Sequence, residues 1–186
     1  MKIIPRLIIP DLAHVPSYVQ ALKEGHRCGG GAVATADHVL KTEAYPQAFL
    51  DELFAPKPPT WINEKGEEVE RVPQTTVWLV DNDTFIGDAK IRHRLNDRLL
   101  QSGGHIGYGV RPSMRRKGYA TEMLRLCLIW ARDNLNLDKA LLSCVVDNEA
   151  SARVMEKNGG QLIDITPHPW EVGKMQKRYW VPVPRT

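Results

Sequence analysis

The chain has 186 residues, enough for one domain with a single sizeable core. Its apolar content of 42% and its charged content of 25% are ordinary for a globular protein. The net charge of +3 is slight, which argues against binding to nucleic acid or to an anionic membrane through bulk charge, so any cationic site must be local.

Neither a membrane segment nor a metal motif stands out in the sequence. Pro5, Pro10 and Asp11 interrupt the apolar residues of the N-terminal stretch, which lacks the uninterrupted apolar core of a signal peptide. No stretch approaches the roughly 20 apolar residues of a membrane span. Three cysteines are widely spaced and form no zinc-ligand pattern: Cys28, Cys127 and Cys144. Cys127 and Cys144 lie inside apolar runs, so we expect them to be reduced core thiols. We expect a cytoplasmic protein with no metal.

The first third of the chain predicts two helices separated by a glycine-rich loop. Residues 7–10 are typical of a short strand, and residues 16–25 are typical of a helix that ends at a glycine. Gly29 to Gly31 then predict a mobile or tightly turned loop. A second helix is predicted over residues 45–54, and residues 55–73 indicate an exposed loop or hairpin.

The rest of the chain changes to strands with two helices between them. Residues 74–81 are rich in β-formers, and a polar turn leads into residues 85–95, a predicted antiparallel partner. Residues 95–104 are predicted to be a connection. Helices are predicted from Gly118 and over residues 148–160. Further strands are predicted in four segments: 104–110, 139–147, 161–167 and 174–183. This order predicts a mixed α/β sheet with one strand–helix–strand crossover.

A cationic turn precedes the first of these two helices. Arg115, Arg116 and Lys117 stand directly before Gly118, which leaves the backbone open to a ligand. The helix that follows carries apolar residues at helical spacing: Ala120, Met123, Leu124, Cys127, Leu128 and Ala131. The first amides of such a helix have no partner inside it, and with the helix dipole they bind phosphate well. Neither a Walker A motif nor a dinucleotide fingerprint is present, so this turn is the candidate anion site.

The run Arg115-Arg116-Lys117-Gly118-Tyr119-Ala120 resembles the R/Q-x-x-G-x-G/A signature of the GNAT superfamily of N-acetyltransferases, in which it binds the pyrophosphate of acetyl-CoA. The preceding HIGYGVRPS resembles the strand that leads into this signature. Residues 148–153, followed by residues 156–160, resemble the second cofactor-side motif of the superfamily. The resemblance covers about residues 74–183 and is close to the ribosomal-protein acetyltransferase type and to uncharacterised GNAT proteins.

The resemblance implies an α/β fold of GNAT type, in which a mixed, mostly antiparallel central sheet has splayed central strands and flanking helices. It implies a single domain over residues 1–186, with acceptor-side helices and loops in 1–73 and an acetyl-CoA-binding core in 74–186. Acetyl-CoA would be a co-substrate, without a metal. The implied cofactor contacts are Val110, Arg111, Arg115, Arg116, Lys117, Gly118, Tyr119, Ala120, Thr121, Asn148, Ser151 and Arg153. Asn148 also suits a helix cap, and Ser151 and Arg153 equally suit an ordinary helix surface.

The catalytic residues follow less directly from the resemblance. Many superfamily members have a tyrosine as general acid seven residues after the asparagine, and this chain has Met155 there, for which core packing is the expected role. Tyr179 or Tyr108 then remains as the acid, unless the thiolate of CoA leaves with the help of solvent. His105 is the predicted base, with a structural strand histidine as the alternative, and His93 is a weaker candidate.

The sequence therefore predicts transfer of an acetyl group from acetyl-CoA to a primary amine of an unidentified small molecule or protein. The alternative is a catalytically weak acyl-CoA-binding or sensing module of the same fold. A nucleic-acid binder ranks last because only one compact basic cluster is present. We expect no nucleic-acid or membrane partner and leave a homodimer open. Glu43, Asp51 and Glu52 are either an attractor of a cationic amine or a solvated helix face, and Trp61 either lines an acceptor pocket or anchors its loop.

Overall fold

The computed structural model describes residues 5–63 and 66–184. The helices in these residues are α1 (Val15–Lys23), α2 (Ala36–Ala44), α3 (Pro46–Phe54), α4 (Asp97–Gln101), α5 (Tyr119–Leu135) and α6 (Glu149–Lys157). The strands are β1 (Arg6–Ile8), β2 (Thr60–Ile62), β3 (Glu68–Glu70), β4 (Gln74–Asp81), β5 (Thr84–Arg92), β6 (Ile106–Val110), β7 (Lys139–Val145), β8 (Gln161–Pro167) and β9 (Met175–Pro182). Short 3-10 helices are η1 (Leu12–His14), η2 (Cys28–Gly30) and η3 (Pro112–Met114).

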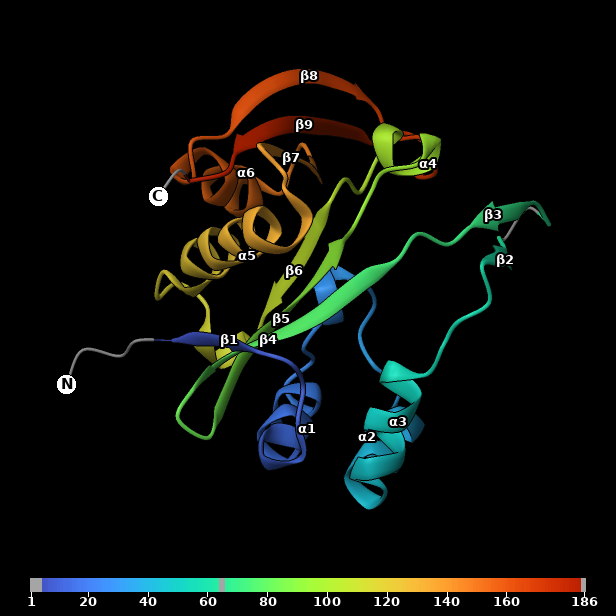
Figure 1. Ribbon diagram of the computed structural model, residues 1–186, viewed down its shortest axis with the longest axis vertical. Helices are drawn as coiled ribbons and strands as arrows, with labels where there is room; N and C mark the ends of the chain where they lie inside the picture. The colour runs from blue at the N-terminus through green and yellow to red at the C-terminus, as the bar shows by residue number, and fades with distance from the viewer. Residues whose placement is uncertain (1–4, 64–65, 185–186) are drawn as a thin grey trace.

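Two antiparallel sheets meet at one point and then diverge. One has the order β1-β4-β5-β6 and the other the order β7-β9-β8. Where they meet, the His105 amide donates to the Leu141 carbonyl at 2.7 Å, and the Leu141 amide donates to Nδ1 of His105 at 2.9 Å. Beyond this junction no ladder joins β6 to β7 within residues 5–63 and 66–184, so the strands splay apart. The predicted fold class, with its splayed central strands and flanking helices, is confirmed (Figure 1).

Gly104 makes the close approach at this junction possible. It has a φ of +61°, and a Cβ added there would lie 2.1 Å from the Leu141 carbonyl oxygen. We expect Gly104→Ala to lower the free energy of unfolding by about 2–4 kcal/mol, because the backbone of β7 cannot yield as a flexible side chain would. Denaturant titration measures this loss. The control is Gly103→Ala, which also has a positive φ (+94°) but whose Cβ would meet side-chain atoms at ordinary contact distances, Leu99 Cδ2 at 3.5 Å and Arg92 Nη1 at 3.8 Å; an equal loss in both variants would refute this account.

The core lies on both faces of the β4–β5–β6 sheet. On one face α5 and α6 pack against both sheets, and the apolar residues predicted at helical spacing along α5 are buried there, except Ala120 in the first turn, which is half-buried. Cys127 is among these fully buried residues. On the other face α1 and α3 pack over an aromatic cluster in which Tyr18 stacks on Trp78 with ring centroids 4.7 Å apart. The sheet that leads into the splay is therefore held rigidly from both sides.

Two short helices were missed by the sequence analysis. α2 lies between the glycine loop and α3, and Thr35 caps it by accepting from the His38 amide at 3.2 Å. α4 lies in the stretch expected to be a connection, and Asn96 caps it through the Leu99 amide. Residues 55–73 contain the β2–β3 hairpin, in agreement with the expected loop or hairpin; residues 64–65 lie outside the described part.

The boundary drawn at residue 73 does not separate two structural units. β1, from the first part of the chain, pairs with β4 in the main sheet. The single domain over residues 1–186 stays a prediction, and residues 1–4 and 185–186 lie outside the described part. Among the residues described, every helix is too short or too polar to cross a membrane.

Candidate cofactor and acyl-transfer site

The cationic turn lies at the N-terminus of α5, as predicted. Gly118 is the residue before the helix and has a φ of +85°, a left-handed conformation that strains any residue with a side chain. A Cβ there would meet nothing within 4 Å, so the backbone faces open space. In the described part of the chain, none of the three cations before it forms an ion pair with a carboxylate: Arg115, Arg116 and Lys117. Their charge and the free helix amides are available to an anion.

Arg111, in contrast, has a carboxylate partner, Glu24, at the end of α1. Its guanidinium donates to the Glu24 carboxylate at 2.6 and 2.8 Å, and the other oxygen of that carboxylate accepts from the Ser113 amide at 3.1 Å. The Arg111 amide donates to the Ile86 carbonyl at 2.9 Å. These contacts fix the start of the turn relative to β5 and the end of α1. Hydrogen bonds from Arg111 and Ser113 lower the pKa of Glu24 to about 2.

The low pKa of Glu24 makes the stability gained from the Glu24–Arg111 contact depend on pH, and the sign of that dependence is fixed. A carboxylate whose pKa falls on folding, here from 4.5 to about 2, stabilises the fold above pH 4.5, and that stability is lost as the pH falls toward 2. After allowance for solvent screening, we expect Glu24→Gln to lower the free energy of unfolding by about 1 kcal/mol at pH 7. Below pH 4.5 the difference between parent and variant should shrink as the pH falls. Denaturant titration at several pH values measures it. Glu43→Gln, which breaks an exposed pair with Lys23, is the control; a pH-independent difference would contradict this account.

Three elements meet across the splay on the side of α5 and α6. Tyr108 extends from β6, and its hydroxyl lies 2.9 Å from the Ser151 hydroxyl on α6. Ser151 is itself held at the helix cap, where its amide donates to Asn148 Oδ1 at 3.1 Å, so the predicted capping role of Asn148 is confirmed. Cys144 on β7 lies close to both hydroxyls. Burial raises the pKa of Tyr108 to about 12, so this hydroxyl keeps its proton at neutral pH.

The other predicted catalytic residues have structural partners. The Tyr179 hydroxyl donates to Glu156 on α6 at 3.0 Å, and its ring is buried in the core. Nδ1 of His105 is occupied by the Leu141 amide, while burial and the nearby Arg92 lower the pKa of His105 to about 4. His105 is therefore neutral near pH 7 and weakly basic. Met155 is fully buried, as its expected packing role requires.

Arg153 lies on the surface of α6 in an ion pair with Glu149, four residues before it. This is the ordinary helix-surface arrangement that the sequence left open for Arg153. The side chain of Ser151, in contrast, points toward β6 and is half-buried. The structure therefore distinguishes Ser151, which faces β6, from Arg153, which lies on the helix surface, although the sequence offered the same two roles for both.

The glycine loop covers the opposite face of β6. A Cβ on Gly107 would lie 2.9 Å from the Gly29 carbonyl, so the strand lacks a side chain where the loop rests on it. Asp88 on β5 anchors the loop by accepting from the Gly29 amide at 2.9 Å and by pairing with His26 at 2.8 Å. Within the described residues, His26, Cys28 and Asp88 are close enough to share a metal ion, but the Asp88 oxygen already accepts these two hydrogen bonds. Sequence reasoning did not identify this anchor.

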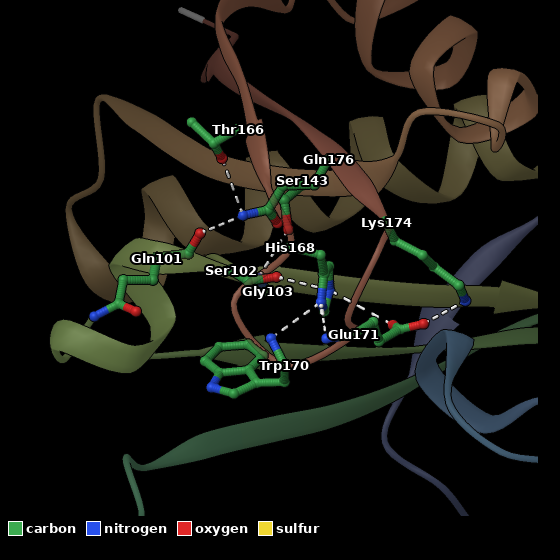
Figure 2. A network of polar contacts seen from close by, with 10 residues as sticks. All are labelled: Gln101, Ser102, Gly103, Ser143, Thr166, His168, Trp170, Glu171, Lys174 and Gln176. Atoms are coloured by element: carbon green, nitrogen blue, oxygen red, sulfur yellow. Dashed lines mark hydrogen bonds and ion pairs between the residues drawn. The ribbon is translucent and has the colours of Figure 1, made fainter.

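A polar network ties the β8–β9 turn to α4 (Figure 2). Nε2 of His168 lies 3.4 Å from the Ser102 hydroxyl and 3.6 Å from Glu171. Nδ1 of the same ring accepts from the amides of Trp170 and Glu171. A serine nucleophile would need the carboxylate on the nitrogen opposite to the serine. Here both face the same nitrogen, so the network is structural.

The carboxylates considered for an acceptor do not form one cluster. Glu43 pairs with Lys23 at 2.6 Å, and Asp51 accepts from Gln47 at 2.7 Å. Glu52 lines a cavity between α3 and the sheet. Trp61 is 37% exposed, and the guanidinium carbon of Arg98 lies 5.6 Å from the centre of its ring.

Comparison with known proteins identifies a family that matches this chain. A family model described as an acetyltransferase (GNAT) domain matches residues 35–161, more than half of the chain. The uncharacterised N-acetyltransferase YnaD of Bacillus subtilis is 30% identical over 95 residues, which are 51% of this chain and 52% of the relative. The match thus spans about half the length of that curated relative.

Solved structures show the same fold at low sequence identity. The ribosomal-protein acetyltransferase RimL in complex with coenzyme A has a TM-score of 0.60 at 14% identity, covering 96% of this chain and 94% of that one. Mutant forms of the spermidine/spermine N-acetyltransferase SpeG from Vibrio cholerae have a TM-score of 0.60 at 13% identity, covering 96% and 95%. The splayed strands, the glycine turn before α5 and the family match lead to one conclusion: the chain belongs to the GNAT acetyltransferase family.

Proposed function

We propose that the protein is an acetyl-CoA-dependent N-acetyltransferase that acetylates a primary amine of a small-molecule or protein acceptor. One observation carries the proposal: an open, cationic turn begins α5 directly beside the splay of β6 and β7. Family membership supports it, and so does the coenzyme A in the complex of a structural neighbour. The proposal includes no metal, nucleic acid or membrane. A homodimer and a cytoplasmic location stay predictions.

The proposed cofactor site follows the order of the elements. The turn from Arg115 to Ala120, with Thr121, would hold the pyrophosphate through backbone amides and positive charge. Val110 and Asn148 would flank the pantetheine arm in the splay, and Ser151 would lie near its sulfur end. Arg111 would act by fixing the turn through Glu24. Arg153 would contribute little, because Glu149 already pairs with it.

The reaction requires two proton movements. The nitrogen lone pair of the acceptor attacks the thioester carbonyl, a C–N bond forms and the C–S bond breaks. The amine loses a proton, and the thiolate of CoA gains one. We assign the second proton to Tyr108, acting with Ser151, because this hydroxyl pair lies in the splay and stays protonated. Tyr179 is the other tyrosine that the sequence left open as the general acid. Water is the proposed acceptor of the amine proton, since the predicted base His105 has a pKa of about 4.

Two measurements test the function. Isothermal titration of acetyl-CoA into the protein is expected to give micromolar binding, and a thiol reagent is expected to detect CoA release that depends on an added amine. The buried Met155 favours one second candidate, a module that binds acetyl-CoA without turnover. Binding without amine-dependent release across a broad amine panel would identify that module. Absence of binding would reject both.

A further inference from the structure

A cavity lies on the face of the sheet that carries the glycine loop. Its volume is about 870 Å³, and most of its lining comes from α3, β4, β5 and two connecting segments, one between α3 and β2 and one between β3 and β4. This volume is within the range of small-molecule sites. Its apolar lining includes Phe49, Leu53 and Phe54 from α3, and Val72. The cavity can therefore bury an apolar group of a ligand.

The charged groups on this cavity are mostly cationic. Lys57, Arg71 and Lys90 line it, and Glu52 is its one carboxylate among the described lining residues. None of the three cations has a carboxylate partner there: Lys57 and Arg71 donate to backbone carbonyls. An apolar wall with unneutralised cations suits a ligand that carries both an apolar group and an anionic group.

Lys90 lines the cavity from β5, the strand next to β6, on the face opposite to Tyr108. It pairs in register with Gly107 on β6, the strand that borders the splay. Its side-chain stem lies under the glycine loop, 3.3 Å from where a Cβ on Gly29 would be. Arg92, two residues along the same strand, points to the same face and donates to the Gly103 and Gly104 carbonyls. Lys90 and Arg92 thus place two cations along β5, in the direction of the junction between the two sheets.

We propose that this cavity binds the acceptor, and that the acceptor is a primary amine with an apolar side chain and a carboxylate, the chemical class of an apolar amino acid. The inference rests on the proposed function. Lys90 and Arg71 would bind the carboxylate, and the aromatic wall would bind the side chain. The same cations disfavour the ammonium form of the amine, which must be neutral to attack. They also repel polyamines.

Equilibrium binding tests the cavity without any need for turnover. N-acetyl-L-phenylalanine and its primary amide differ in the carboxylate alone. We expect the protein to bind the acid about 10- to 100-fold more tightly, as a charge-assisted hydrogen bond allows. Lys90→Met, which keeps the stem, and Arg71→Gln, which lies at an exposed position, should each reduce this preference. Lys41→Gln removes an equal charge from α2, outside the cavity lining, and should leave the preference intact.

Kinetics provide a second readout on the same proteins. The ratio of kcat/KM for L-phenylalanine to that for 2-phenylethylamine should be above 10 in the parent and should fall about 10-fold or more in Lys90→Met, through KM. Equal binding of acid and amide, binding of neither, or a preference for spermidine would overturn the proposal. Titration of acetyl-CoA into the same samples reports separately on the proposed function, because it does not depend on the acceptor.

Discussion

Gly118→Glu is expected to weaken acetyl-CoA binding by at least about 100-fold, a loss of roughly 2.7 kcal/mol. The new carboxylate would project from the residue that precedes α5 into open space, where we propose that the pyrophosphate lies. It would repel the phosphates and would itself pair with Arg115 to Lys117, which have no carboxylate partner among the described residues. The fold should tolerate the change, because an anion at a helix N-terminus is favourable. Isothermal titration measures the binding.

Two further variants separate charge from backbone strain. Gly118→Ala keeps the site uncharged but carries a side chain at a φ of +85°, which costs about 1 kcal/mol. We expect it to weaken acetyl-CoA binding by less than about 10-fold. Gly173→Glu places the same carboxylate at a φ of +79°, also with nothing within 4 Å, in the turn between β8 and β9. If Gly173→Glu weakened binding as strongly as Gly118→Glu, the turn would not be the phosphate site.

The sequence could predict the two helix starts of the proposed cofactor site because their signals are local. The start of α5 at Gly118 and the Asn148 cap each depend on neighbours within one helical turn, and both are confirmed. The apolar spacing along α5 likewise predicts which of its residues are buried. The sequence did not predict α2 and α4, because each is short and mostly exposed and its apolar periodicity is therefore weak.

The proposed acceptor side depends on contacts between distant residues. Asp88 holds the Gly29 amide from 59 positions away, and a single acidic residue in an apolar strand does not reveal its partner. The role of His105 is similar: its strand position is readable from sequence, but the Leu141 amide that occupies its ring nitrogen is 36 positions away. A cavity formed by α3, β4 and β5 has no sequence signature at all.

Tyr108→Phe is expected to lower kcat by about 100-fold while acetyl-CoA affinity changes less than about twofold, since the lost hydroxyl would act on the departing thiolate and not on the bound cofactor. Burial raises the pKa of Tyr108 to about 12, so the hydroxyl stays protonated throughout the range in which the protein can be assayed. The ratio of parent to variant kcat should therefore be constant between about pH 6 and pH 9. A ratio that changes within this range would indicate a donor that titrates there, and Tyr108 would then be the wrong residue.

Tyr179→Phe is the matched control, because it removes the other tyrosine hydroxyl considered as the acid. That hydroxyl donates to Glu156 on α6 instead of reaching Ser151. We expect kcat to stay within about twofold and the unfolding free energy to fall by about 1 kcal/mol, the usual worth of one hydrogen bond. Ser151→Ala should lower kcat in the same direction as Tyr108→Phe, since it removes the partner that orients the donor. A large loss of kcat in Tyr179→Phe with an active Tyr108→Phe would instead assign the proton to Tyr179 on β9, the other tyrosine that the sequence left open.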